Sequence, residues 1–184
     1  MFKKLTAIII FITINNFAQT TYTTVPKFPT QNDTIVIEFD VTNATHPNKI
    51  AGYYEQVYAH TGVALQIDEG TPNQWQNVIG SWGSASQPML TRIATNIYTI
   101  TIANPRKYYN VTDASKKITE LDFVLRSSDG SKQTENIYIP LYETGIKVVL
   151  NSPKLSTNFG DPARSPIFID ENAGLSISAA TSEL

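Results

Sequence analysis

Apolar residues recur at every second position in several separate segments of the chain, and this period is the strongest constraint on its fold. Between Thr34 and Val41 the alternating residues are Ile35, Ile37, Phe39 and Val41. Gln56–Val63, Ile97–Ile102 and Lys117–Ser127 show the same period. Successive side chains of a β-strand point to opposite faces, so each segment is predicted to be a strand with one buried face. Because no segment with a helical period exceeds a turn or two, we expect an all-β chain.

Turn residues divide the rest of the chain into further short strands, about seven in all. Tyr22–Asn32 contains two prolines and suits an edge strand, whereas Met89–Ile93 is predicted to form a hairpin with the segment after it. Asn104–Thr112 is expected to hold a single helical turn, and Thr134–Leu141 the last strand. The pattern predicts an immunoglobulin-like antiparallel β-sandwich over residues 19–143.

The alternation also predicts which side chains fill the core of this sandwich. The expected core residues are Ile35, Ile37, Phe39, Ile100, Leu121 and Phe123. Asp122 and Arg126 alternate with them and are expected to face solvent. Residues 68–86, in contrast, have no period and are rich in Gly, Pro, Asn and Ser. We expect a long loop there, and such loops are usually functional or disordered.

The N-terminal residues are predicted to be a targeting segment rather than part of the fold. Lys3 and Lys4 precede an almost unbroken apolar run over residues 5–14, the pattern of a secretory signal peptide. Cleavage is expected after Ala18, which makes residues 1–18 the signal. The run is too short for a membrane anchor, which takes about 20 apolar residues. The mature protein is therefore expected to be secreted or extracellular, with no membrane insertion after signal removal.

Residues 144–184 are predicted to start a second, truncated β-domain. Ile146, Val148 and Leu150 alternate, Ile167–Ile169 is short and apolar, and a further alternation follows near the end of the chain. Three strands cannot enclose a core of their own. We therefore expect an incomplete second β-sandwich, and the alternative is that these strands pair with the first domain.

Composition excludes several classes of function. The absence of cysteine excludes disulfides, thiolate metal sites and catalytic cysteines. Lys+Arg 14 against Asp+Glu 16 gives a net charge of -2, without the basic stripe of a nucleic-acid-binding protein. His46 and His60 are too few for a transition-metal site, so no metal and no cofactor are expected. His46 is expected to be solvated in a turn. His60, on a predicted strand, is expected either to hydrogen-bond a neighbour or to contact a ligand.

Motifs of catalysis are not found in the chain. It has neither a Gly-x-Ser-x-Gly elbow nor a phosphate-binding loop. A glycosidase needs two carboxylates that flank one sugar bond, and Asp68, Glu69, Glu120 and Asp122 lie in no motif that pairs them. We therefore expect this chain not to be an enzyme by itself.

Two tryptophans in the aperiodic segment point to a different chemistry. Trp75 and Trp82 lie close to the amides Asn73, Gln74, Gln76 and Asn77. A sugar ring packs its apolar face on an aromatic ring, while its hydroxyl groups need amide and carboxylate partners. The tryptophans are therefore candidates for carbohydrate binding. The alternative is that one or both cover the end of the sandwich as core side chains.

Five segments together resemble one known module. They are PKFPTQNDTIVIEFDVT (Pro26–Thr42), QVYAHTGV (Gln56–Val63), NQWQNVIGSWG (Asn73–Gly83), MLTRIATNIYTITI (Met89–Ile102) and LDFVLRSSDGSKQTENIYIPL (Leu121–Leu141). In order and spacing they are similar to the N-terminal immunoglobulin-like, starch-binding-like β-sandwich of secreted Bacteroidetes-type α-amylases of glycoside hydrolase family 13. GIKVVLNSPK (Gly145–Lys154) resembles the start of the second sandwich that follows this module. The catalytic barrel of such enzymes is not in this chain, so no catalytic residue carries over.

The resemblance implies an accessory region, or a fragment, of an extracellular α-amylase. The leading hypothesis is therefore a secreted, non-catalytic module that binds an α-glucan, a polysaccharide, with a covalently linked catalytic domain in a longer parent. Its predicted carbohydrate-binding residues are Trp75, Trp82, His60 and Tyr58. The competing hypothesis is an immunoglobulin-like spacer domain of a cell-surface or secreted protein with no ligand of its own.

Overall fold

The computed structural model describes residues 19–67, 70–145, 148–152 and 178–181. The predicted signal peptide, Asp68, Glu69 and the predicted strand at Ile167–Ile169 lie outside the described residues. The one helix of the described part has four residues, and none there is long and apolar enough to cross a bilayer.

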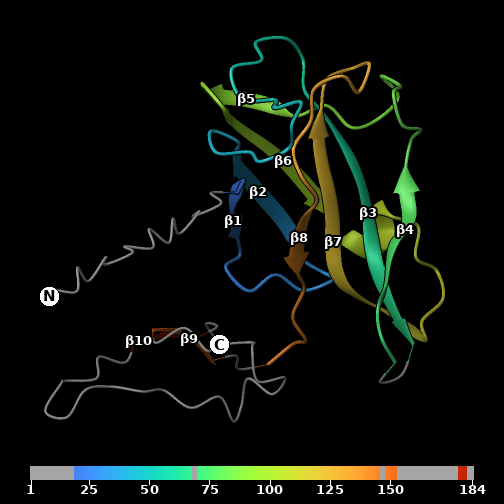
Figure 1. The fold of residues 1–184 in the computed structure, drawn as a ribbon. Helices are drawn as coiled ribbons and strands as arrows, with labels where there is room; N and C mark the ends of the chain where they lie inside the picture. Colours follow the sequence, from blue (N-terminus) through green and yellow to red (C-terminus); the bar gives the residue numbers. More distant parts are fainter. Residues whose placement is uncertain (1–18, 68–69, 146–147, 153–177, 182–184) are drawn as a thin grey trace, which may run out of the picture.

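Two antiparallel sheets of four strands each form the body of the molecule (Figure 1). The first sheet runs in the order β1 (Thr21–Val25), β2 (Thr34–Asp40), β6 (Ile97–Ala103) and β5 (Thr91–Ala94). The second runs in the order β4 (Asn73–Ile79), β3 (Tyr58–Ile67), β7 (Lys116–Arg126) and β8 (Ile137–Pro140). In the immunoglobulin nomenclature these orders are A-B-E-D and C′-C-F-G. The predicted all-β, immunoglobulin-like sandwich is confirmed.

The core lies between the two sheets and is built from the alternating residues. Phe39 of β2 meets Phe123 of β7 with ring centroids 5.3 Å apart. All six predicted core residues are buried, and Ile100 is the most exposed of them at 8%. Full burial of one such side chain stabilises a fold by about 1.5–3 kcal/mol. The alternation therefore identifies both the strands and their inward faces correctly.

The segment predicted to be one long loop contains strand β4, so that prediction is wrong. Its pairing with β3 shifts register twice, between Thr61 and Val63 and again between Val63 and Leu65. Trp75 and Asn77 also adopt positive φ angles of 56° and 50°. Such irregular backbone destroys the period of two, which is why the sequence of β4 does not look like a strand.

Asp122 and Arg126 are fully buried, which corrects the expectation that they face solvent. They do lie on the outer face of β7, as the alternation predicts, but that face is covered. The backbone of Trp75 in β4 contacts Asp122, and the segment after β4 contacts Arg126 through Ser84. The single helical turn is confirmed as α1 (Pro105–Tyr108), between β6 and β7.

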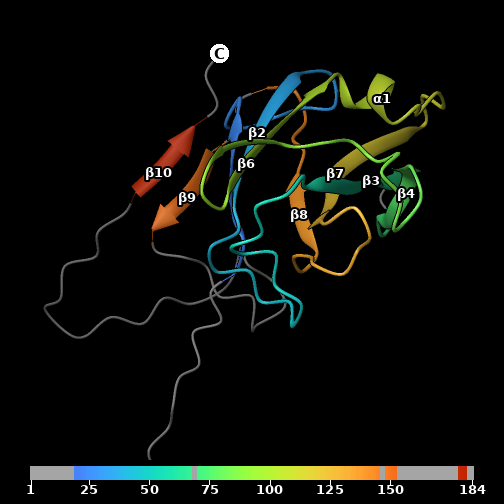
Figure 2. The same cartoon turned by 90° about the horizontal axis from the view of Figure 1, so that it is seen from above.

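The remaining described strands form a separate two-stranded sheet. β9 (Val148–Ser152) pairs antiparallel with β10 (Ser178–Thr181) (Figure 2). Whether residues 144–184 belong to a second domain stays a prediction, because most of them lie outside the described residues.

Candidate functional site

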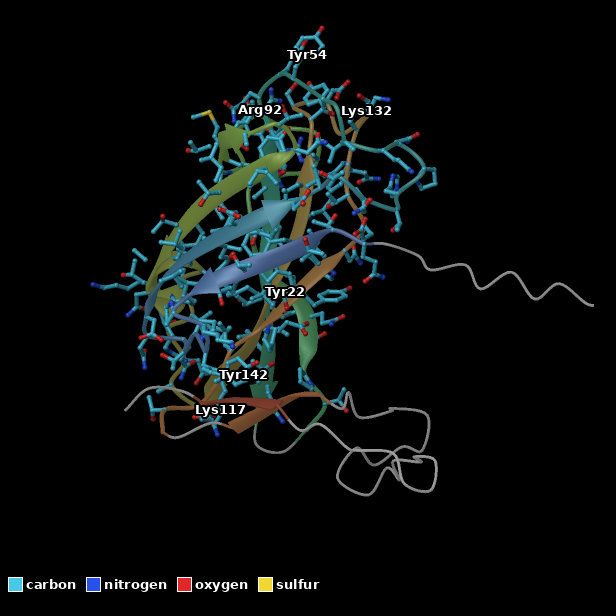
Figure 3. All side chains as sticks on the ribbon, turned by 90° about the vertical axis from the view of Figure 1, so that its left-hand side faces the viewer. Tyr22, Tyr54, Arg92, Lys117, Lys132 and Tyr142 are labelled. Carbon is cyan, nitrogen blue, oxygen red and sulfur yellow. The ribbon has the colours of Figure 1, made fainter. Side chains whose placement is uncertain are left out.

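A pocket of about 350 Å³ lies on the outer face of the β4-β3-β7-β8 sheet. Side chains of the sheet and of the segment after β4 form one wall, namely His60, Trp75, Trp82 and Val124. The loops before β3 and before β8 form the other wall, namely His46, Gln133, Thr134, Glu135 and Asn136. Figure 3 places Lys132, the neighbour of Gln133, at the same end of the sandwich as Tyr54 and Arg92.

Three aromatic rings pack together in the first wall. The His60 imidazole stacks on the Trp75 indole, with centroids 5.4 Å apart and planes 24° from parallel. The Trp82 ring meets the same imidazole edge-on, with centroids 4.9 Å apart. Trp82 is 48% exposed, so much of its indole faces solvent. The wall is thus a broad apolar surface that remains open to a ligand.

Trp75 is held in place through its backbone rather than by burial of its ring. Its N–H donates to Asp122 Oδ2 at 2.5 Å, and its ring lies edge-on to Tyr138 with centroids 6.5 Å apart. Gly62, which lies opposite Asp122 in the register, lets β4 come this close. A Cβ at Gly62 would lie 2.9 Å from the Gln76 carbonyl oxygen and 3.0 Å from a methyl group of Val78.

The Trp82 indole packs against the buried Arg126 guanidinium and the turn at Gly130. The Arg126 guanidinium lies 5.5 Å from the indole centroid, within range for a cation–π interaction. Gly130 also lies beside this ring: it has φ 74°, and a Cβ there would come 3.0 Å from the indole Nε1. The turn at Asp129-Gly130 thus leaves room for the tryptophan.

Arg126 organises the polar contacts beneath the aromatic wall. Its Nη1 donates to the Ser127 and Ser128 carbonyl oxygens at 2.6 and 2.9 Å, and its Nη2 donates to the Ser84 carbonyl oxygen at 2.5 Å. Its Nε donates to Gln87 Oε1 at 2.5 Å. A buried guanidinium that uses four of its five N–H donors in this way fixes the loops around it, since any lost partner leaves a charged donor unpaired.

Gln87 bridges Arg126 and His60 by hydrogen bonds, and this bridge determines which imidazole nitrogen is protonated. A guanidinium only donates, so the Gln87 amide must turn its oxygen to Arg126 and its Nε2 to His60 Nδ1. His60 Nδ1 then accepts, and the proton of the neutral ring sits on Nε2. Burial, and secondarily the Arg126 charge, hold the pKa of His60 below its usual value. At neutral pH the imidazole is therefore a neutral Nε2–H donor.

The second wall carries hydrogen-bond acceptors and amide groups. Glu135 Oε1 accepts from the Thr20 N–H at 2.5 Å, and Oε2 from the Thr45 N–H at 2.8 Å. Burial raises the pKa of Glu135, but these amide hydrogen bonds outweigh it and keep the pKa below its usual value. His46 Nε2 lies 2.7 Å from the Gln133 amide. This wall therefore adds a carboxylate and several amide groups to the lining of the pocket.

Of the predicted binding residues, the structure brings three together. Trp75, Trp82 and His60 line the pocket, whereas Tyr58 does not and instead lies with its ring 6.0 Å from the Arg126 guanidinium. His46, expected to be solvated, is half-buried in the pocket wall. The loop residues Gln133, Glu135 and Asn136 were not predicted, because only the tertiary fold brings them to the tryptophans.

A smaller hollow of about 170 Å³ lies beside Tyr54, Arg92 and Tyr98. Arg92 is already engaged there, since it donates to the Tyr53 carbonyl oxygen and lies 5.4 Å from the Tyr98 ring. No group of three His, Asp or Glu side chains suited to a metal ion occurs among the described residues. No protein-family model and no curated protein significantly matches the chain.

Proposed function

We propose that this chain is a secreted, non-catalytic carbohydrate-binding module whose ligand is an α-glucan such as starch. The observation that carries the proposal is the pocket itself. Trp75, Trp82 and His60 line it together with Glu135 and the pocket amides. The preference for an α-glucan, and the attachment to an amylase-type catalytic domain, rest on the resemblance of the sequence segments. The extracellular location rests on the predicted signal peptide.

The two walls suit the two kinds of surface that a sugar presents. The exposed Trp82 indole offers an apolar plane to the C–H face of a pyranose ring. Hydroxyl groups at the ring edge both donate and accept hydrogen bonds. The His60 Nε2–H donates, the Glu135 carboxylate keeps lone pairs for accepting, and the Asn136 amide does both. A polar ligand with one apolar face therefore satisfies both walls at once.

The expected affinity is modest. Stacking one sugar ring on an indole removes some tens of Å² of apolar surface on each partner, which contributes about 1–3 kcal/mol. The loss of translational and rotational freedom offsets much of this gain. Dissociation constants are thus expected on the order of millimolar to tens of micromolar. Such a module functions by holding a catalytic domain near an insoluble polymer.

Affinity electrophoresis of the full chain in gels containing amylose tests the proposal. Wild type should be retarded, and Trp82→Ala and Trp75→Ala should each weaken binding about tenfold. Tyr54→Ala is the matched control, because Tyr54 is an aromatic residue with 81% exposure that does not line the pocket. It should be retarded like wild type.

Gels that contain a β-glucan instead of amylose test whether binding requires the α-linkage or only a glucan. Retardation by β-glucan alone would refute the α-glucan assignment while keeping the carbohydrate site. If wild type is not retarded in any gel, or if the tryptophan variants bind like wild type, the proposal fails. The spacer hypothesis then takes its place.

A further inference from the structure

Asp122 has one carboxyl oxygen with no visible partner. Its side chain is fully buried, and its Oδ2 accepts from the Trp75 N–H at 2.5 Å. Its Oδ1 is buried without a hydrogen bond. A buried carboxylate oxygen left unpaired is strongly destabilising. This oxygen must therefore either accept a hydrogen bond or carry a proton.

Glu120 is the neighbouring residue whose carboxylate can accept a proton-mediated hydrogen bond from this oxygen. It lies two residues earlier on the same face of β7, within hydrogen-bonding reach of Asp122. Its own Oε1 accepts from Gln74 Nε2 at 2.8 Å. Consecutive residues of β4, Gln74 and Trp75, therefore each hold one carboxyl group of this pair. Two carboxyl groups in contact form a hydrogen bond only when one of them carries a proton.

No cation neutralises this pair within the described part of the chain. The ion pairs there are Lys116 with Asp113 and Lys117 with Glu143. The titratable groups that the packed elements bring near the pair are three phenols and one imidazole, and none is a lysine or an arginine. They are Tyr138 of β8, His60 of β3, Tyr109 after α1 and Tyr22 of β1. Residues of β4 itself are not titratable.

We infer that Asp122 is a neutral carboxylic acid and the positioning residue of Trp75. Its Oδ1–H donates to the Glu120 carboxylate, while its Oδ2 accepts the Trp75 N–H. Loss of that proton leaves two adjacent negative charges beneath β4. Their repulsion, together with the hydration that a bare buried carboxylate demands, loosens the strand from β7. The consequence for a sugar ligand rests on the proposed function, but the protonation of Asp122 does not.

Asp122 is expected to lose its proton near pH 7. Burial, opposed by the Trp75 hydrogen bond and assisted by the Glu120 charge, raises the pKa of Asp122 to about 7. At pH 6 the pair therefore holds its proton, and Trp75 stays hydrogen-bonded to Asp122. Well above pH 7 the proton is lost, and β4 loosens from β7. His60 gains its charge below its ordinary pKa of about 6.5, on the acid side of this window.

The ionisation is tested first in the wild-type full chain. The ¹³C chemical shift of the Asp122 carboxyl carbon should titrate near pH 7. A midpoint near pH 4, the ordinary range of an aspartate, would overturn the inference. This measurement needs no variant, so it does not depend on the folding of a mutant.

Fluorescence then tests the link to Trp75. In a Trp82→Phe background Trp75 is the sole tryptophan, and its emission should change with a midpoint near pH 7. Asp122→Asn should remove the midpoint, because its amide donates to Glu120 and accepts from Trp75 without a titrating proton. Glu120→Gln should move the midpoint to lower pH. An unchanged midpoint in Asp122→Asn would overturn the positioning role.

Amylose binding at pH 6 and pH 8.5 separates this inference from the proposed function. Wild type should bind more weakly at pH 8.5, and Asp122→Asn should bind equally at both values. Binding that is independent of pH in wild type contradicts the inference but keeps the function. A midpoint near pH 7 by NMR and fluorescence without sugar binding at either pH keeps the inference and refutes the function.

Discussion

Gln87 decides the chemistry of His60, although it does not line the pocket itself. It is buried, and its amide links the Arg126 guanidinium to the imidazole ring through hydrogen bonds. Because Arg126 fixes the amide orientation, the amide in turn fixes which imidazole nitrogen carries the proton. A pocket residue thus acquires its donor character from a buried cation two contacts away.

Replacement of Gln87 by Leu should destabilise the fold. The variant keeps the volume but leaves Arg126 Nε and His60 Nδ1 unpaired, at a cost of about 1–3 kcal/mol. Urea denaturation monitored by far-UV circular dichroism measures the loss. Gln66→Leu is the control, since the Gln66 amide donates to the Gly70 carbonyl oxygen at an exposed position. It should change stability by less than about 0.5 kcal/mol, and equal losses in both variants would contradict the argument.

Single residues also show where sequence reasoning about the site succeeds and fails. Trp75, Trp82 and His60 are recognisable because aromatic rings beside amides are a local signal. Glu135 is not, because its role depends on the backbone amides of Thr20 and Thr45, which are distant in the sequence. Asp122 is misjudged for a related reason: alternation tells which face a residue occupies, but not whether another strand covers that face.

At the scale of elements, β4 is the strand on which the site depends. It is an edge strand that pairs irregularly with β3, and it carries Trp75 at a positive φ. β2 is predictable because its inward residues alternate without interruption, and so is the Leu121–Leu125 part of β7, which follows a register shift near Ile118. β4 is not, because its conformation follows from its close approach to Gly62 and from the carboxyl groups beneath it.

Gly62→Ala should displace β4 while leaving the core intact. The added methyl group would clash with the Gln76 carbonyl oxygen, which lies 2.9 Å from the ideal Cβ position. Overpacking of this kind costs about 1–3 kcal/mol. Amide hydrogen exchange should accelerate in β4 and stay slow in the β2–β6 ladder. Gly70→Ala, whose nearest contact is 3.3 Å, is the control and should leave β4 protected. Uniform acceleration in both sheets would contradict a local effect.

At the scale of the whole molecule, buried tyrosines make the free energy of unfolding depend on pH in the alkaline range. Tyr109 is fully buried after α1, and its hydroxyl group lies 2.6 Å from Thr61 Oγ1. Burial raises the pKa of Tyr109 well above its ordinary value of 10.0, and burial also raises the pKa values of Tyr22 and Tyr108. The unfolded chain therefore releases these protons at lower pH than the folded one does.

The free energy of unfolding should consequently fall as the pH rises above 10. Below pH 10 both states hold the tyrosine protons, so the contribution is fully present there and is lost on the alkaline side. Tyr109→Phe should flatten this decline. It also removes the hydrogen bond to Thr61, which costs about 1 kcal/mol at neutral pH. Urea unfolding between pH 8 and pH 11 provides the comparison, and identical slopes for variant and wild type would refute the role of Tyr109.

The direction of β8 has a consequence for anything tethered to this module. Asn136 lines the pocket immediately before β8, whereas the strand ends at Pro140 toward the end of the sandwich marked by Lys117 and Tyr142 (Figure 3). Four residues of strand cover about 13 Å. A sugar bound in the proposed site would therefore lie near the start of β8, whereas the chain leaves this sheet from the other end of the same strand.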